Sequence, residues 1–326
     1  MRTIIKLKNL TPIHIGTGKE NYDFSSSTLQ SDTISSALAA IRVEYFGKED
    51  VESFISSFTV SSMFPYVDKE YFLPKPHGRL NVKMDGEEHT YRKQLKKIKY
   101  IEKSLWQDIV SGEEVKVSEQ QIQGEYLLSM QMVGQFEKPY ENQVNQRVTV
   151  PRGDSKEAKP FFFDWSYFRE NAGLYCILEC ADESMPEMEQ LFAILGESGI
   201  GTDKNIGGGK FEIEIVKDMP IAQNVEGANS TILLSLYVPT REELEMLELS
   251  TSTYALQQRG GYISGGAEVE LRHLRKKSIY MFDVGSVFTT TQKLGGKVVN
   301  LKPEYNDARM HPIYRNGKPV TVQIKI

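Results

Sequence analysis

The chain has few of the residues that supply nucleophiles, metal ligands or cross-links. Its 326 residues include two cysteines, five histidines and two tryptophans. No two histidines have the spacing of a zinc pair, and no Gly-x-Ser-x-Gly elbow is present. Cys176 and Cys180 are four residues apart. On a strand they would share a face but not bridge easily, so we interpret them as small apolar residues of a cytosolic protein. The sequence therefore predicts no metal and no cofactor.

Long hydrophobic runs and an excess of positive charge are also missing. The start has no apolar signal-peptide core, and no stretch approaches the ~20 apolar residues that cross a bilayer, so we expect a cytoplasmic chain without a membrane partner. The 39 basic residues stand against 44 acidic ones, for a net charge of −5. This excludes a uniformly basic protein, but it allows a nucleic-acid binder whose cations gather at one site.

The order of strand and helix patterns predicts an α+β fold. Residues 3–10 alternate as a strand, and residues 31–46 carry apolar side chains every three to four positions, with Ser31 or Asp32 as the expected N-cap. A second amphipathic helix is expected over residues 186–195, before a glycine-rich loop and a strand. Further strand patterns lie at residues 60–73, 125–133, 159–168 and 173–181. We interpret residues 1–220 as a ferredoxin-like βαββαβ unit.

Two segments interrupt this unit, and a second unit follows it. Residues 74–124 are expected to be an insertion, Lys-rich between Arg92 and Lys103, with a short helix and loops. The polar stretch at about 140–160 contains a Pro-Arg-Gly-Asp turn and predicts a projecting hairpin. After a change of composition at residues 217–229, residues 229–326 begin with a strand and a short helix but offer no second long helix. We expect a reduced copy of the first unit there.

The loop after the second helix is the clearest candidate for ligand binding. Five glycines in eleven residues would let backbone amides approach a phosphate or ribose, with Lys204 and Lys210 supplying charge. The spacing fails the Walker A pattern, because Phe211 stands where Ser or Thr is needed, and the loop follows a helix instead of a strand. The alternative is a flexible helix-to-strand connection, for which one or two glycines would suffice.

Two other segments are candidate sites. In the early loop, Gly16, Thr17, Gly18 and Lys19 are followed by Glu20, so this loop also fails as a P-loop, and His14 is either a general base for RNA cleavage or a polar loop residue. Later in the chain, cations flank Tyr262, which suits phosphate neutralisation and base stacking, although a solvated basic edge strand is an equal alternative. The members of this basic segment are Arg259, Gly260, Gly261, Tyr262, Arg275 and Lys276.

Taken in order, these segments resemble one family. They are the HIGTGK loop, the Leu29–Leu38 helix entry with Leu-Gln-Ser-Asp-Thr, the glycine loop, Arg259-Gly-Gly-Tyr262, RKKSIYMF ending at Phe282, and the terminal HPIYRNG ending at Gly317. Together they are similar to the fourth Csm subunit of type III-A CRISPR–Cas effector complexes, a member of the RAMP superfamily. The resemblance covers most of the chain and is weakest in residues 74–124.

The resemblance implies a fold, a function and partners. The family folds as two ferredoxin-like (RRM-like) units, the second degenerate, with a β-hairpin thumb and a glycine-rich loop. It caps the 5′ handle of the CRISPR RNA (crRNA) and joins the large polymerase/cyclase-type Csm subunit to the backbone Csm subunit. It is regarded as non-catalytic and takes no small-molecule substrate. Its RNA-binding positions map here to His14, Gly16, Thr17, Gly18, Lys19, Ser31, Arg147, Gly201, Lys204, Gly207, Gly208, Gly209, Lys210, Arg259, Gly260, Gly261, Tyr262, Arg275 and Lys276.

Two features of the sequence depart from this family picture. Asp203 places a negative charge beside Lys204, where it would meet a 2′-OH or cap the loop itself. The insertion around Arg92 to Lys103 matches no motif, and it is either a contact for the large subunit or surface decoration.

Two rival functions remain open from sequence. One is a metal-independent endoribonuclease that processes precursor crRNA through His14, with Tyr22 or Lys19, by activating a 2′-OH. The other is a protein-interaction module of the same fold that has no direct contact with RNA.

Overall fold

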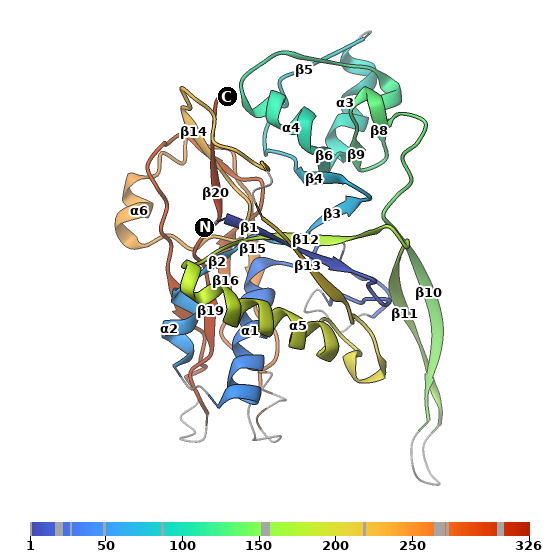
Figure 1. Ribbon diagram of the computed structural model, residues 1–326, viewed down its shortest axis with the longest axis vertical. Coiled ribbons are helices and arrows are strands. Elements are labelled where there is room, and N and C mark those ends of the chain that lie inside the picture. Colours follow the sequence, from blue (N-terminus) through green and yellow to red (C-terminus); the bar gives the residue numbers. More distant parts are fainter. Residues whose placement is uncertain are drawn as a thin grey trace.

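The computed structural model has an α+β fold built around one large sheet (Figure 1). It describes residues 2–16, 22–26, 28–47, 50–85, 88–150, 157–217, 220–263, 271, 274–304 and 310–326, with the side chains of residues 88–90 left aside. Thr17, Gly18, Lys19 and the predicted Pro-Arg-Gly-Asp turn lie outside the described residues. Among the described residues, no helix combines the length and apolar character needed to cross a membrane.

Four antiparallel strands form the centre of the sheet in the order β13-β1-β12-β3. They are β1 (Arg2–Lys8), β3 (Phe64–Val67), β12 (Ala172–Glu179) and β13 (Glu212–Val216). Alternation along β1 divides the core, because Ile5 and Leu7 face one apolar cluster and Ile4 faces the other. Cys176 is buried on β12, and Cys180 follows the strand half-buried; both are free thiols, as expected.

Two helices, α1 (Ser31–Phe46) and α5 (Met185–Ser198), cover one face of these strands (Figure 1). Both predicted helices are confirmed. The expected N-cap is wrong, because Gln30 occupies that position. Ser31 and Asp32 turn their side chains into the protein instead: the Ser31 hydroxyl accepts a hydrogen bond from the Leu236 amide at 3.0 Å, and Asp32 binds arginines.

The insertion, expected to be a short helix with loops, is a structured extension of the sheet that also carries helices. Strands β4 (Glu70–Pro74), β6 (Tyr100–Glu102), β9 (Tyr126–Leu127) and β8 (Ile122–Gln123) continue the sheet beyond β3. Trp106 anchors the insertion, since its ring is fully buried and its Nε1 donates to the Pro74 carbonyl at 2.9 Å. Its helices are α3 (Glu88–Lys97) and α4 (Lys103–Val110), and its small parallel pair is β5 (Val82–Met84) with β7 (Val115–Val117).

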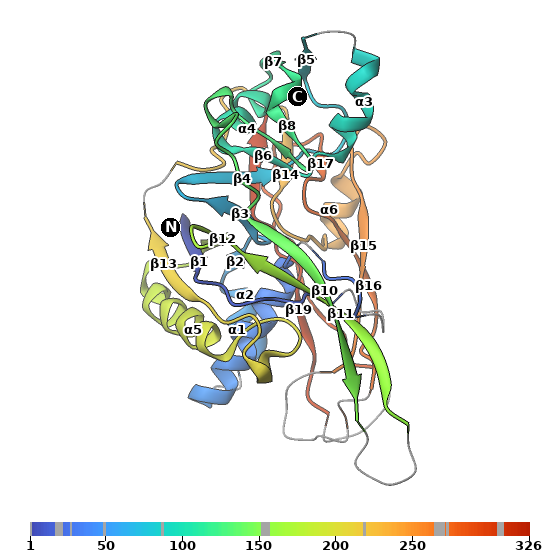
Figure 2. The same ribbon diagram turned by 90° about the vertical axis from the view of Figure 1, so that its right-hand side faces the viewer.

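The strand expected over residues 125–133 is mostly wrong. Only Tyr126–Leu127 is a strand, and the chain then turns into a 3-10 helix at Met130–Met132. The projecting hairpin is present: β10 (Tyr140–Thr149) pairs with β11 (Lys159–Phe168) along its whole length and extends away from the body in both views (Figures 1 and 2).

The C-terminal part consists of short strands and one short helix, α6 (Arg241–Met246), and its described residues contain no longer helix. It shares the core of the first part, because Ile232 and Val322 belong to the same apolar cluster as Ile4. Its strands are β14 (Ser230–Leu233), β15 (Leu256–Arg259), β16 (Ile279–Phe282), β17 (Val287–Phe288), β18 (Val298–Asn300), β19 (Tyr314–Asn316) and β20 (Thr321–Ile324).

In the N-terminal part, two further short elements, α2 (Val51–Ser56) and β2 (Thr59–Val60), precede β3.

Candidate nucleic-acid interface

Backbone hydrogen bonds join the early loop, the glycine loop and the base of the hairpin. The Thr11 amide donates to the Lys210 carbonyl at 2.9 Å, and the Thr202 amide donates to the His14 carbonyl at 2.9 Å. On the other side of the early loop, the Ile13 amide donates to the Ser166 carbonyl of β11 at 3.1 Å. Three segments that are far apart in the sequence therefore form one continuous surface.

The glycines of the loop are required by its compact backbone. Gly201 and Gly209 have φ angles of +97° and +67°, which disfavour other residues. A Cβ on Gly209 would lie 1.9 Å from the Ile200 carbonyl oxygen, and one on Gly208 would lie 2.7 Å from the Trp165 ring. The compact backbone thus requires more glycines than the one or two that the alternative, a flexible connection, would need. Of the five, Gly207 alone has open space where its Cβ would be, although its φ is +92°.

Arg147 reaches from β10 across to the glycine loop. Its guanidinium forms an ion pair with Asp203 and lies over the Phe163 ring, 4.2 Å from the centroid. The Trp165 ring is also near, at 5.2 Å. Arg147 keeps about 28% of its side chain exposed. Asp203 therefore interacts with the hairpin, a role that the sequence analysis did not assign to it.

His14 is part of the packing beneath this surface. Its side chain is 1% exposed, its Nδ1 lies 2.7 Å from the Asp164 carbonyl oxygen, and its ring packs 4.5 Å from the Phe163 ring. Tyr22 stacks on the outer side of Phe163, with 5.8 Å between ring centroids. Gly16 lies beside Thr202 in the exposed part of the early loop, and Lys204 and Lys210 extend into solvent.

The second group of predicted residues is built around a buried carboxylate, Asp32. Arg259 donates to both oxygens of Asp32, at 2.8 and 2.9 Å, and Arg315 binds the same carboxylate. Burial would raise the pKa of Asp32, but the charges of Arg315 and Arg259 outweigh it and hold the pKa below its usual value. Arg259 and Ser31 thus have a visible structural task, which is to bind the C-terminal part to the start of α1.

Beyond this carboxylate, Tyr262 and Arg275 reach the surface, whereas Lys276 is partly buried. Arg275 lies over the exposed Tyr262 ring, 4.9 Å from the centroid, and donates to the Tyr262 hydroxyl at 3.2 Å. Burial, with Arg315 and Arg259 nearby, lowers the pKa of Lys276 to about 8. Gly261 has a φ of +108°, and a Cβ on Gly260 would lie 2.7 Å from the Ser278 hydroxyl.

Sequence reasoning missed several residues that organise these surfaces. Asp32 and Arg315 lie in segments that carried the family resemblance, but Asp32 was expected only as a helix cap and Arg315 had no assigned role. Phe163 and Trp165 lie in the aromatic run of β11 and carry the ring surface under Arg147. An acidic residue in the first turn of an otherwise apolar helix face was the available signal for Asp32. Among the described residues, no three His, Cys, Asp or Glu side chains form a group that could hold a metal ion.

Comparison with known proteins agrees with the family resemblance that the sequence motifs predict. The family described as the CRISPR Csm4 C-terminal domain matches residues 226–324. The Csm4 protein of Mycobacterium tuberculosis H37Rv is 24% identical over 307 residues, which is 93% of this chain and 92% of that protein. The Csm4 protein of Streptococcus thermophilus is 24% identical over 326 residues, which is 96% of each. The predicted resemblance is confirmed.

Solved structures support the fold. A chain in the crystal structure of a Csm3-Csm4 subcomplex of the type III-A CRISPR-Cas interference complex has a TM-score of 0.68 at 19% identity, covering 99% of this chain and 100% of that one. A chain in the crystal structure of a Csm1-Csm4 cassette with cA4 has a TM-score of 0.63 at 19% identity, covering 100% and 99%. The mixed α+β architecture with a large sheet is therefore shared with these two chains.

Proposed function

We propose that this chain, which carries a Csm4 C-terminal domain and is similar to Csm4 proteins along nearly its whole length, holds the 5′ handle of the crRNA in a type III-A CRISPR effector complex. It is a Csm4-type subunit of a type III complex. Its work there is binding and positioning, which set the register from which the guide is counted.

The observation that carries this proposal is the joining of three candidate segments into one surface. The early loop, the glycine loop and the hairpin base are bonded to each other, and Arg147, Lys204 and Lys210 lie on that surface. Single-stranded RNA is held on such surfaces by phosphate contacts and by bases stacked on flat side chains. In this proposal the two lysines neutralise phosphates and Arg147 inserts where the strand bends.

The ion pair between Arg147 and Asp203 adds a step to this binding. A phosphate that approaches Arg147 competes with a carboxylate that is already in place. The exposed fraction of both side chains is about 30%. Solvent and salt therefore weaken the pair, and replacing the carboxylate by a phosphate costs little free energy. Until RNA binds, Asp203 and the Phe163 ring hold Arg147 in this orientation.

The partners in this proposal are the large subunit and the backbone subunit. Crystal structures of similar chains are of Csm1-Csm4 and Csm3-Csm4 assemblies, which supports a bridging position for this chain. The proposed organisation is two ferredoxin-like units, residues 1–220 and 229–326, with the β10–β11 hairpin as the thumb. The strand order β13-β1-β12-β3, with α1 and α5 on one face, supports the first unit. The second unit, with three small sheets and α6, would be the degenerate one.

A binding role also fits the surroundings of His14 better than catalysis does. A general base must reach the 2′-OH of its substrate. The His14 ring is buried under Phe163 and Tyr22, and one ring nitrogen is engaged by the Asp164 carbonyl. We therefore propose a non-catalytic subunit that resides in the cytoplasm with its complex.

The experiment that tests the proposal is photocrosslinking of a guide-loaded complex. RNA with 4-thiouridine in the constant 5′ segment should attach to the early loop, the glycine loop or the hairpin. The variant Arg147→Gln/Lys204→Gln/Lys210→Gln should lower the yield of guide RNA that co-purifies with the complex. The matched variant Lys69→Gln/Lys217→Gln/Lys293→Gln removes the same charge from exposed lysines elsewhere and should not. Crosslinks of the 5′ segment confined to other surfaces would refute the proposal.

A further inference from the structure

One stretch of the insertion, residues 92–103, is rich in positive charge. Residues 92–103 contain six lysines and arginines and one acidic residue, Glu102, in a protein whose net charge is −5. Glu102 does not offset these cations at the surface, because it is 2% exposed. Its carboxylate accepts from the Ser104 amide at 2.9 Å and caps helix α4. The exposed charge of this segment is therefore entirely positive.

Helix α3 presents that charge on one side. Ile98, just after the helix, is buried in the core and Leu95 packs against it, whereas Arg92, Lys93, Lys96 and Lys97 are exposed. Among residues whose side chains the structure describes, none of these four cations forms an ion pair. Arg92 and Lys93 lie about one helical turn from Lys96 and Lys97, which is about 6 Å along the helix axis. We call these four residues the α3 basic face.

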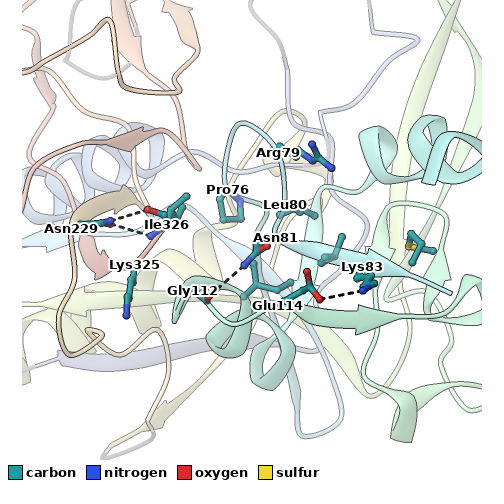
Figure 3. Close-up of a pocket in the computed structure, with 13 residues that line it drawn as sticks. Pro76, Arg79, Leu80, Asn81, Lys83, Gly112, Glu114, Asn229, Lys325 and Ile326 are labelled. Carbon is teal, nitrogen blue, oxygen red and sulfur yellow. Dashed lines mark hydrogen bonds and ion pairs between the residues drawn. The ribbon is translucent and has the colours of Figure 1, made fainter. Parts of the chain in front are cut away.

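An open groove adjoins this face. It has a volume of about 780 Å³ and runs between β5, the end of α4 and the C-terminal residues (Figure 3). Helix α3 packs against β5, which forms part of the groove wall. Arg79, Lys83 and Lys325 lie around the groove, and the one acidic side chain of its lining, Glu114, is 3.8 Å from Lys83. The groove thus carries three cations beside β5, the strand against which α3 packs.

The composition of the α3 basic face favours a nucleic-acid backbone over a protein partner. Protein interfaces have an apolar, aromatic-rich centre and are depleted in lysine. No large apolar side chain is exposed among residues 91–97 of α3. Lysine and arginine without apolar anchors are instead the groups that neutralise phosphates independently of sequence.

We propose that the α3 basic face and its groove bind the sugar–phosphate backbone of single-stranded RNA at a second site, separate from the site proposed for the 5′ handle. Figures 1 and 2 place α3 at one end of the long axis and the hairpin at the other. Single-stranded RNA bound here is recognised by its phosphate charge alone, because the face has no exposed aromatic ring on which a base could stack. The second site rests on its own contacts and does not require that the glycine loop bind RNA.

The test measures how binding of a fluorescein-labelled 20-nucleotide oligouridylate depends on salt. The full chain carrying Arg147→Gln/Lys204→Gln/Lys210→Gln is the background, so that the proposed handle site contributes little. Adding Arg92→Gln/Lys93→Gln/Lys96→Gln/Lys97→Gln should lower the slope of log affinity against log salt by about 3, at roughly 0.7 per phosphate contact. At 0.1 M salt this corresponds to a loss of affinity on the order of a hundredfold or more.

The control carries Lys69→Gln/Lys217→Gln/Arg241→Gln/Lys293→Gln, with the same change of net charge at exposed positions elsewhere. Its slope should stay within about 1 of the background, because scattered cations do not line one strand. Equal losses in both variants would show a general charge effect and overturn the proposal. An unchanged RNA slope in the α3 variant, with loss of co-purification with other complex subunits, would assign the face to a protein partner and overturn it as well. Failure of the handle crosslinks would leave this slope difference intact, so the two proposals fail separately.

Discussion

Replacing Asp32 by asparagine tests whether the carboxylate at the start of α1 holds the two parts of the chain together. The side chain is fully buried and accepts two hydrogen bonds from Arg259, at 2.8 and 2.9 Å, and a further one from Arg315. Asparagine keeps the shape but loses the charge, and its NH₂ group would face a guanidinium donor. Arg315 is 6% exposed and would keep a buried charge without its counter-ion.

Breaking a buried pair by removing one partner costs about 3–5 kcal/mol of unfolding free energy. Asp32→Asn should therefore lose about that amount in urea denaturation followed by circular dichroism. The matched control is Asp50→Asn. Asp50 pairs with Arg42 but is 57% exposed, and Arg42 keeps Glu187 as a second partner, so its loss should cost clearly less than the loss of Asp32. A cost for Asp32→Asn no larger than that of the control would refute the reasoning.

The same pair has a pH signature whose direction follows from the lowered pKa of Asp32. A carboxylate with a depressed native pKa stabilises the fold above its unfolded pKa of about 4, and this contribution is lost as the pH falls through the native pKa. Wild-type stability should therefore fall in acid more steeply than that of Asp32→Asn. Parallel acid limbs for the two proteins would contradict the assignment.

Three further predictions concern RNA and ionisation. If about 6 phosphates are contacted, affinity for guide RNA should fall by roughly three decades between 50 and 200 mM salt, and a flat dependence would argue against an electrostatic surface. Labelled repeat RNA in EDTA should stay intact with both the wild type and His14→Ala; cleavage by the wild type that the variant loses would replace the binding role with an endoribonuclease. Because the native pKa of Lys276 is about 8, its unfolded form binds more protons between pH 8 and about 10.5, so stability gains a rising contribution with pH there. Lys276→Gln should remove that rise in urea titrations, and an unchanged pH slope would disprove it.

Local patterns were enough to predict helices α1 and α5 and the projecting hairpin. The apolar spacing of α1 and α5 and the polar turn region between β10 and β11 are properties of short stretches of sequence. The strand expected after Gly124 was a wrong prediction, because an apolar run shows that residues are buried but not that they pair in a sheet. Its apolar residues pack into the insertion core whether or not they pair in a ladder, so Leu127 and Leu128 are buried although the strand ends there.

Residues of the candidate site also differ in this way: local sequence predicted the state of some, whereas distant parts of the chain decided the partners of others. Lys204 and Lys210 were predicted to supply positive charge to a ligand, and both are exposed. Arg259 was grouped with them, but it is held by Asp32, a residue 227 positions away in the chain. The number of glycines in the loop suggested a ligand, whereas contacts with Ile200 and Trp165 are what require them. Charge is visible in a sequence, but the partner of each charge is not.

By itself the amino-acid sequence predicted the resemblance to Csm4 proteins, the α+β class and the stretches where cations and glycines gather, because these depend on composition and local spacing. Tertiary structure alone decided that His14 is buried, that Arg147 meets Asp203, that Asp32 joins two arginines, and that the insertion displays its lysines on one helix face. The physical reason is that pairing, burial and exposure depend on segments brought together from distant parts of the chain, and folding sets those distances.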